Sequence, residues 1–404
     1  MNAKDAALLL LGAVLGAIFG AMFAPWYNGA TAALARWRRR AASARREKDG
    51  VAGSLSVRLV EYYTDRGLAS SLYVPKMVGP GKEIALLHDP SITFPPEIDI
   101  YRDDFLACDH TFTRFPVDKS VIRHYRRIGA RLFDGEFMLA KAVTLHGDEL
   151  TRLHVGRFNF FAYASICFKI QREIMSRWRR PVLHDTYLQT FRGSLGSDLQ
   201  PQAVGCMAAV LVHGDDGIYL AIARRSTEVV NGPGMRSLAP VFGFECNAIG
   251  GRTSKYGLTF YNFVREFSEE FFDFEDLVDM MRSRHVDPDW IFQLPAAAAI
   301  RREAIEGRLV LRRTGVAINP NDGIINIAVV AHFTSPSFFE QLLPEMRPNW
   351  ETAGDMSAGP IEFVKIDDPR IDEWVAKQAI DPSSVFALDL ARQYAAARAP
   401  APRP

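Results

Sequence analysis

The sequence lacks the features that mark several large classes of protein. Its 404 residues include only four cysteines, and none of them form a CxxC pair; they are Cys108, Cys167, Cys206 and Cys246. This spacing argues against a disulfide framework and favours buried free thiols in a reducing compartment. The nine histidines show no HExxH spacing, so the sequence also argues against a dedicated zinc centre.

An excess of charge of either sign is also missing. The chain carries 48 basic and 47 acidic residues. Proteins that bind nucleic acid over their surface usually carry a basic excess, so we expect no nucleic-acid partner. The length exceeds that of one ordinary core and suffices for two domains with an additional segment.

The N-terminus contains one long apolar run. Residues Ala6–Pro25 carry no charge, and the next charged residue is Arg36, at the start of a basic cluster. About twenty apolar residues are enough for a helix to cross a bilayer. We therefore expect a transmembrane anchor at 1–27 and a basic juxtamembrane linker at 28–50.

The charges flanking this run predict its orientation. Positive flanks stay in the cytoplasm, so we expect a single-pass protein of the inner (cytoplasmic) membrane, with its N-terminus outside and its bulk inside. Membrane lipid would then be one partner. Gly12, Gly16 and Gly20 would share one face of the span, which favours self-association of the helices. The alternative is that glycine is simply common in membrane helices.

The middle segment, 51–194, has mixed signals and is expected to be α+β. The sequence leaves open whether it is a separate sensor or an extension of the domain that follows. Aromatic residues crowd the stretch 156–174. Their helical spacing favours a buried helix, while a platform for stacking nucleobases is the alternative.

The segment 195–390 has clearer signals and is followed by an expected disordered tail at 391–404. Apolar runs bounded by turn residues predict strands, and apolar residues at helical spacing predict helices. The expected strands are 203–213, 218–223, 242–248, 309–318, 324–333 and 361–366, and the expected helices are 259–272, 372–378 and 382–397.

The helix at 259–272 carries an acidic cluster. Glu266, Glu269 and Glu270 are separated by three or four residues, so their side chains are neighbours on the helix. Carboxylates this close repel one another unless a positive charge lies among them, and Mg²⁺ prefers oxygen ligands. Arg265 can pair with Glu269 one turn on. A solvated Glu-rich face is the alternative. Gly250 and Gly251, upstream, allow the backbone to approach a ligand closely.

The run Arg265-Glu266-Phe267-Ser268-Glu269-Glu270 resembles the core of the Nudix box, and Gly251 falls where that box begins. The resemblance covers roughly 195–390. It implies an α/β/α sandwich with a mixed sheet, and a nucleotide pyrophosphohydrolase that uses Mg²⁺ or Mn²⁺. It further implies that Glu266, Glu269 and Glu270 bind the metal, that Glu266 acts as base, and that Arg265 orients the helix. Two positions depart from the box: Gly257 replaces its isolated Glu, and Phe272 replaces its second Gly.

The order of anchor, middle segment and divergent Nudix-like domain resembles the membrane-Nudix effectors of bacterial cyclic-oligonucleotide anti-phage signalling (CBASS). That resemblance implies antiviral defence, in which a cyclic di- or oligonucleotide binds and the host stops growing or dies. One alternative is a membrane-tethered Nudix pyrophosphatase acting on a nucleotide sugar or dinucleotide. Another is a catalytically inactive Nudix module that only binds.

Overall fold

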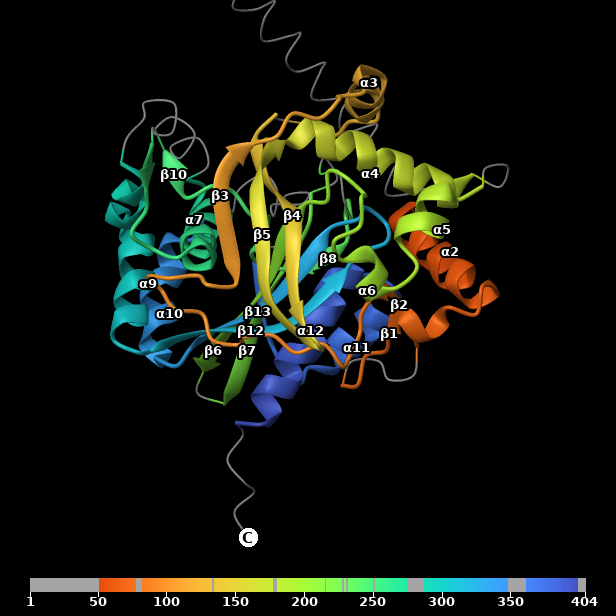
Figure 1. The fold of residues 1–404 in the computed structure, drawn as a ribbon. Helices are drawn as coiled ribbons and strands as arrows, with labels where there is room; N and C mark the ends of the chain where they lie inside the picture. The colour runs from red at the N-terminus through yellow and green to blue at the C-terminus, as the bar shows by residue number, and fades with distance from the viewer. Residues whose placement is uncertain are drawn as a thin grey trace, which may run out of the picture.

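The protein is described by a computed structural model (Figure 1). The structure describes residues 51–398 apart from 78–81, 133, 177–179, 215, 227–228, 230–231, 250, 275–286 and 348–360. Within these residues the chain is a mixed α/β protein with one nine-stranded sheet, one three-stranded sheet and one hairpin.

The nine-stranded sheet forms the centre of the fold. Its main path runs β1 (Leu72–Tyr73), β2 (Ile84–Leu87), β12 (Leu309–Ile318), β13 (Ile325–Phe333), β6 (Val204–Gly214), β7 (Gly217–Arg224) and β14 (Ile361–Lys365). Two short strands extend it: β8 (Arg236–Leu238) pairs with β7, and β9 (Val241–Gly243) pairs with β6. The β6–β13 pair is parallel and its neighbours are antiparallel, so the sheet is mixed.

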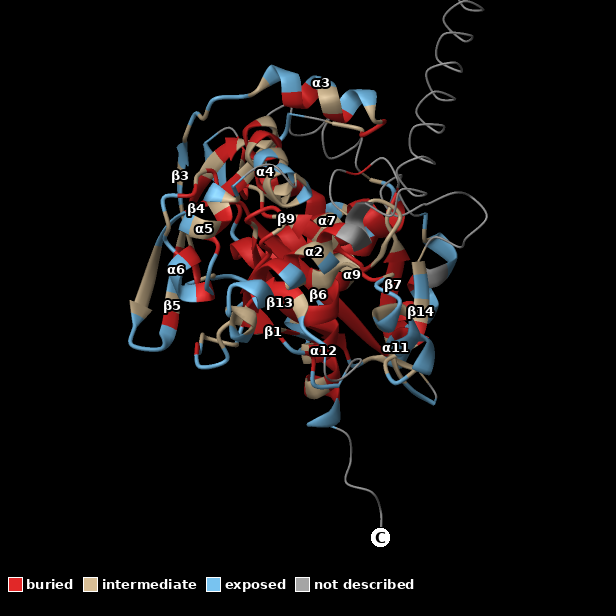
Figure 2. Cartoon of the chain, turned by 90° about the vertical axis from the view of Figure 1, so that its right-hand side faces the viewer, coloured by how far each residue is buried: buried red, intermediate tan, exposed pale blue. Residues whose placement is uncertain are grey.

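Strand β6 shows why the sheet is covered on both faces. It reads as one apolar run, which is typical of a strand buried on both sides. Ala208 and Val210 belong to a core shared with helix α7, whereas Ala209 and Leu211 belong to a core shared with helix α12. Successive side chains of a strand point to opposite faces, so a single run supplies both cores. Figure 2 shows the buried residues gathered around these central strands.

Helices cover both faces of the main sheet. The helices after β9 are α7 (Leu258–Phe272), η2 (Pro288–Gln293), α9 (Pro295–Ile305), α10 (Pro336–Leu342), η3 (Leu343–Glu345), α11 (Pro369–Ala376) and α12 (Pro382–Ala396). Helix α7 packs on α9, and α12 packs on β12, β13 and β6. The two helical layers with the sheet between them form a sandwich.

The N-terminal part of the described chain contributes a second, smaller sheet. Its strands lie in the order β3 (Leu106–Phe112), β5 (Glu149–Asn159) and β4 (Glu136–His146). Its helices are α2 (Val51–Asp65), η1 (Ala69–Ser71), α3 (Lys119–Arg127), α4 (Phe160–Met175), α5 (Val182–Tyr187) and α6 (Phe191–Ser194). The hairpin β10 (Ala248–Ile249) and β11 (Arg252–Thr253) precedes α7.

This N-terminal part is joined to the main sheet rather than separated from it. Strand β2 pairs with β12, and the Met138 amide donates to the Phe244 carbonyl at 2.8 Å. Leu59 and Leu153, from the middle segment, belong to the same core as α7. The middle segment and the segment after residue 195 therefore share a core.

Several sequence predictions agree with these elements. The predicted strand at 309–318 coincides with β12, and the predicted helix at 259–272 begins one residue later than α7. The stretch 156–174 forms the end of β5 and most of α4, where Tyr163 and Ile170 are buried. That burial supports a core helix rather than a stacking platform. The predicted strand at 242–248 is wrong in length, because β9 ends at Gly243 and a loop follows.

The expected single-pass membrane architecture is corrected by the structure. Among the described residues no helix is both long and apolar enough to cross a bilayer. The longest, α4, has 16 residues, fewer than the roughly twenty that a span requires. The predicted anchor at 1–27, with Gly12, Gly16 and Gly20, lies outside the described residues. The supported fold class is mixed α/β with several sheets, and a single-pass inner-membrane location is not supported.

Candidate functional site

Helix α7 is held in place by its apolar face and by hydrogen bonds from its first turn to Asp103. Phe260, Phe263 and Phe267 recur at helical spacing and are fully buried. At the start of the helix, the Asp103 carboxylate accepts hydrogen bonds from the Thr259 amide, at 3.0 Å, and from the Thr259 hydroxyl. Asp103 belongs to the middle segment, so a loop far away in the sequence positions this helix.

Arg265 lies at the centre of a group of carboxylates. Its Nη1 donates to both carboxylate oxygens of Glu269 at 3.0 Å, and its Nη2 donates to Glu266. Glu245, in the loop after β9, adds a third carboxylate, with its Oε1 3.6 Å from Arg265 Nη1. The Arg265 side chain is only 4% exposed. The structure thus brings Arg265, Glu266 and Glu269 together, as the spacing predicts.

Glu270 makes a contact of its own with the main sheet. Its Oε1 accepts a hydrogen bond from the Val241 amide at 3.2 Å, at the start of β9. Among the described residues, the carboxylate oxygens of Glu266, Glu269 and Glu270 do not form a group in which all ligand atoms lie within 4.8 Å of one another. Side-chain rotation would be required before all three could hold one cation.

Burial and neighbouring charges perturb the titration of this cluster. Burial raises the pKa of Glu266 well above its ordinary value, and Glu269, Glu270 and Glu245 raise it further, while Arg265 lowers it. Burial opposes the charge of Arg265, but the surrounding carboxylates raise the pKa of its guanidinium. The cluster therefore favours additional positive charge, supplied by a proton or by a cation.

The glycines near α7 have distinct environments. Gly251 forms the β10–β11 turn with φ +81°, and a Cβ placed there would meet nothing within 4 Å. Gly250 lies outside the described residues. Gly257 replaces the isolated Glu of the Nudix box and packs against the backbone of a neighbouring loop. A Cβ at this position would lie 3.1 Å from the Asp99 carbonyl oxygen. Close packing therefore excludes a glutamate at 257 without a backbone shift.

Phe272, the other departure from the box, is the last residue of α7; it is buried and belongs to the same core as the rest of the helix. The residue after the helix, Asp273, adopts a left-handed conformation with φ +56°. An acidic residue with a short side chain thus provides the C-terminal turn that glycine commonly provides.

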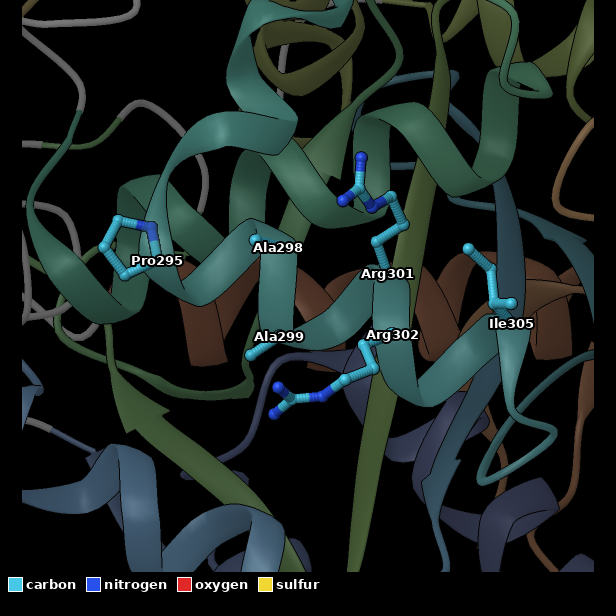
Figure 3. A pocket seen from close by; sticks show the side chains of 6 residues that line it. All are labelled: Pro295, Ala298, Ala299, Arg301, Arg302 and Ile305. Carbon is cyan, nitrogen blue, oxygen red and sulfur yellow. The ribbon is translucent and has the colours of Figure 1, made fainter.

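A pocket of about 440 Å³ lies on α9 (Figure 3). All of its lining residues come from that one helix: Pro295, Ala298, Ala299, Arg301, Arg302 and Ile305. None of the glutamates of α7 lines it.

Two features of the candidate site were not predicted from the sequence. Glu245 lies within the strand predicted at 242–248. A carboxylate in the middle of an apolar run can indicate a functional residue, and the sequence does contain this sign. Cys108, His110 and Cys246 also come together, with their ligand atoms all within 4.8 Å of one another. A hydrogen bond from Cys108 is the main reason that the pKa of Cys246 is lowered to about 6. Cys108 and His110 are two residues apart, but nothing local connects them to Cys246.

The fold and the site define a class: a mixed α/β sandwich with an arginine–carboxylate cluster on a helix that packs against the central sheet. Comparison with protein-family models and with curated proteins found no match for the chain. The Nudix resemblance therefore rests on the sequence motif at 251–270.

Proposed function

We propose that this protein is a divalent-cation-dependent nucleotide pyrophosphohydrolase of the Nudix type. The observation that carries the proposal is the position of Glu266, whose side chain is only 14% exposed, among three further carboxylates. Because burial and those neighbours raise the pKa of Glu266, the cluster favours a bound positive charge. A hard cation with oxygen ligands, Mg²⁺ or Mn²⁺, matches this donor set.

Each residue of the cluster has a distinct role in this proposal. Glu266, Glu269 and Glu270 would hold the cation, which would neutralise phosphate oxygens and activate water when bound. Arg265 orients Glu269 through its two 3.0 Å hydrogen bonds. Glu266 deprotonates as positive charge arrives and so can serve as the base. The expected substrate is a nucleoside diphosphate linked to another group, such as a nucleotide sugar or dinucleotide.

The test is turnover by the purified full-length chain with Mg²⁺ or Mn²⁺, on a panel of nucleotide sugars and dinucleotides. Glu266→Gln and Glu269→Gln should each lower kcat by about 10²-fold or more, since each removes a group acting on the reacting phosphate. Glu373→Gln is the control, because Glu373 lies on α11 with 64% of its side chain exposed. Absence of turnover across the panel, or full activity of both variants, contradicts hydrolysis.

A nucleotide-binding module without catalysis is the second candidate. Two observations favour it: Gly257 leaves no room for the isolated box glutamate, and Arg265 already pairs with Glu266 and Glu269. Isothermal titration with linear nucleotides and with cyclic di- and oligonucleotides distinguishes the two functions. Tight Mg²⁺-dependent binding without product supports the binding module. Binding of a cyclic oligonucleotide in particular would support a role as a CBASS effector.

A further inference from the structure

Two cysteines and one histidine converge where the small sheet meets the loop that leads to α7. His110 Nδ1 lies 3.0 Å from Cys246 Sγ and 3.4 Å from Cys108 Sγ. A tetrahedral zinc ion with Zn–S near 2.3 Å and Zn–N near 2.0 Å separates its sulfur and nitrogen ligands by roughly 3.6 Å. The His110 nitrogen therefore lies about 0.6 Å and about 0.2 Å closer to the two sulfurs than it would around such an ion, and small side-chain movements would make up the difference.

The backbone around His110 is shaped to bring its ring to the cysteines. Cys108 pairs with Val155 and Phe112 pairs with Arg157, so three residues of β3 lie opposite Gly156 alone. Within this bulge His110 adopts φ +56°, a left-handed conformation that is uncommon outside glycine. Bulges re-aim side chains and are frequent beside functional sites.

The chemistry of the three ligands selects the cation. Thiolate and imidazole ligands favour a borderline or soft ion such as Zn²⁺, whereas the oxygens of Glu266 and Glu269 favour a hard ion. Met138 is fully buried and places its Sδ 4.0 Å from Cys108 Sγ, which closes one side with another soft atom. Cys108 and His110 are partly exposed, so a fourth zinc position can be reached by water.

We propose that Cys108, His110 and Cys246 bind one Zn²⁺ ion that joins β3 to the loop between β9 and β10. This ion is separate from the Mg²⁺ or Mn²⁺ site on α7, and its test does not use a nucleotide.

The position of the loop gives this ion a structural consequence. Glu245 precedes Cys246, and both of its backbone groups are held by the Asn262 side chain on α7 at 2.9 Å. Zinc would therefore hold the small sheet to the segment that presents Glu245 to Arg265. Zinc binding should raise the stability of the folded chain, because the ligands come together only when it folds.

The experiment measures metal content in the full-length chain, reconstituted with Zn²⁺ under reducing conditions and then desalted. We expect one zinc per chain, and Co²⁺ in its place should give the sulfur-to-cobalt charge-transfer and intense visible bands of a tetrahedral thiolate site. Cys108→Ser, His110→Asn and Cys246→Ser should each lower the bound zinc at least tenfold. Cys167→Ser is the control, because that buried sulfur lies outside the cluster and accepts hydrogen bonds from Tyr125 and Gln171.

The proposal is overturned if the wild-type chain retains no zinc, or if its Co²⁺ spectrum lacks the sulfur bands. It is also overturned if all three variants retain zinc as the control does. Because the Co²⁺ spectrum is recorded on the wild-type chain, the test holds even where a variant fails to fold. An intact Cys108–Cys246 disulfide in protein handled under these reducing conditions would likewise refute it.

Discussion

The ion pair between Asp103 and Arg313 gives the sharpest test of how the site is supported. Asp103 Oδ1 lies 2.6 Å from Arg313 Nη2, and both side chains are 2% exposed. The same carboxylate accepts from the amides of Leu106, at 3.1 Å, and Thr259, at 3.0 Å. It therefore connects the middle segment, strand β12 and the start of α7.

Asp103→Asn keeps the shape of the side chain but leaves the Arg313 guanidinium buried without its countercharge. Breaking a buried pair in this way costs about 3–5 kcal/mol of unfolding free energy. At roughly 2–4 °C per kcal/mol, the thermal midpoint should fall by about 6–20 °C. Thr259→Ala keeps the backbone amide that donates to Asp103 but removes the donating hydroxyl and one methyl group, and it should cost about 1 kcal/mol.

Urea unfolding followed by circular dichroism, together with differential scanning calorimetry, measures these losses. The double variant Asp103→Asn, Arg313→Met should lose less stability than the sum of the two single variants, because the unpaired charge is gone. If Asp103→Asn loses less than about 1 kcal/mol of unfolding free energy, the ion pair does not support α7 as argued. The same holds if the losses of the single variants Asp103→Asn and Arg313→Met simply add in the double variant.

Three further predictions follow from packing and burial. Gly257→Ala should lower the unfolding free energy measured in urea by about 1–3 kcal/mol, because the new Cβ would lie 3.0–3.2 Å from the backbone of 99–102. In the control Gly135→Ala the new Cβ meets no atom within 4 Å, so the unfolding free energy should change little. Burial raises the pKa of Asp322 to about 7 from its ordinary 3.8. The stability that its protonated carboxyl contributes is therefore complete below pH 3.8 and is lost as the pH rises through 7. Asp322→Asn should remove this pH dependence from the unfolding free energy measured between pH 4 and 8. Asp389→Ala leaves four hydrogen-bond donors without their acceptor, including the Tyr73 hydroxyl at 2.6 Å. The unfolding free energy should fall by about 3 kcal/mol or more. A loss below about 1 kcal/mol would contradict this prediction.

The elements that could be predicted are those specified by local patterns. The period of apolar residues in α7 and the apolar runs of β6, β12 and β13 predict helix and strands close to their observed bounds. The arginine and glutamates of α7 meet because residues one turn apart on a helix are neighbours whatever else folds around them.

The apolar run at the N-terminus shows the limit of such patterns. Length and lack of charge at 6–25 predicted a membrane span, but the described helices are too short or too polar to cross a bilayer. The predicted segment itself lies outside the described residues. Local composition is thus enough to suggest a span, while the described fold is built from sheets with helices on both faces.

By itself, the sequence determined the helix that carries Arg265, Glu266 and Glu269, because their contacts span no more than four residues. Only the tertiary structure decided which distant groups join them. Asp103 reaches Arg313 across 210 positions, and His110 reaches Cys246 across 136. Such pairs depend on strand register and on the packing of two sheets, which arise from many weak contacts summed over the whole core.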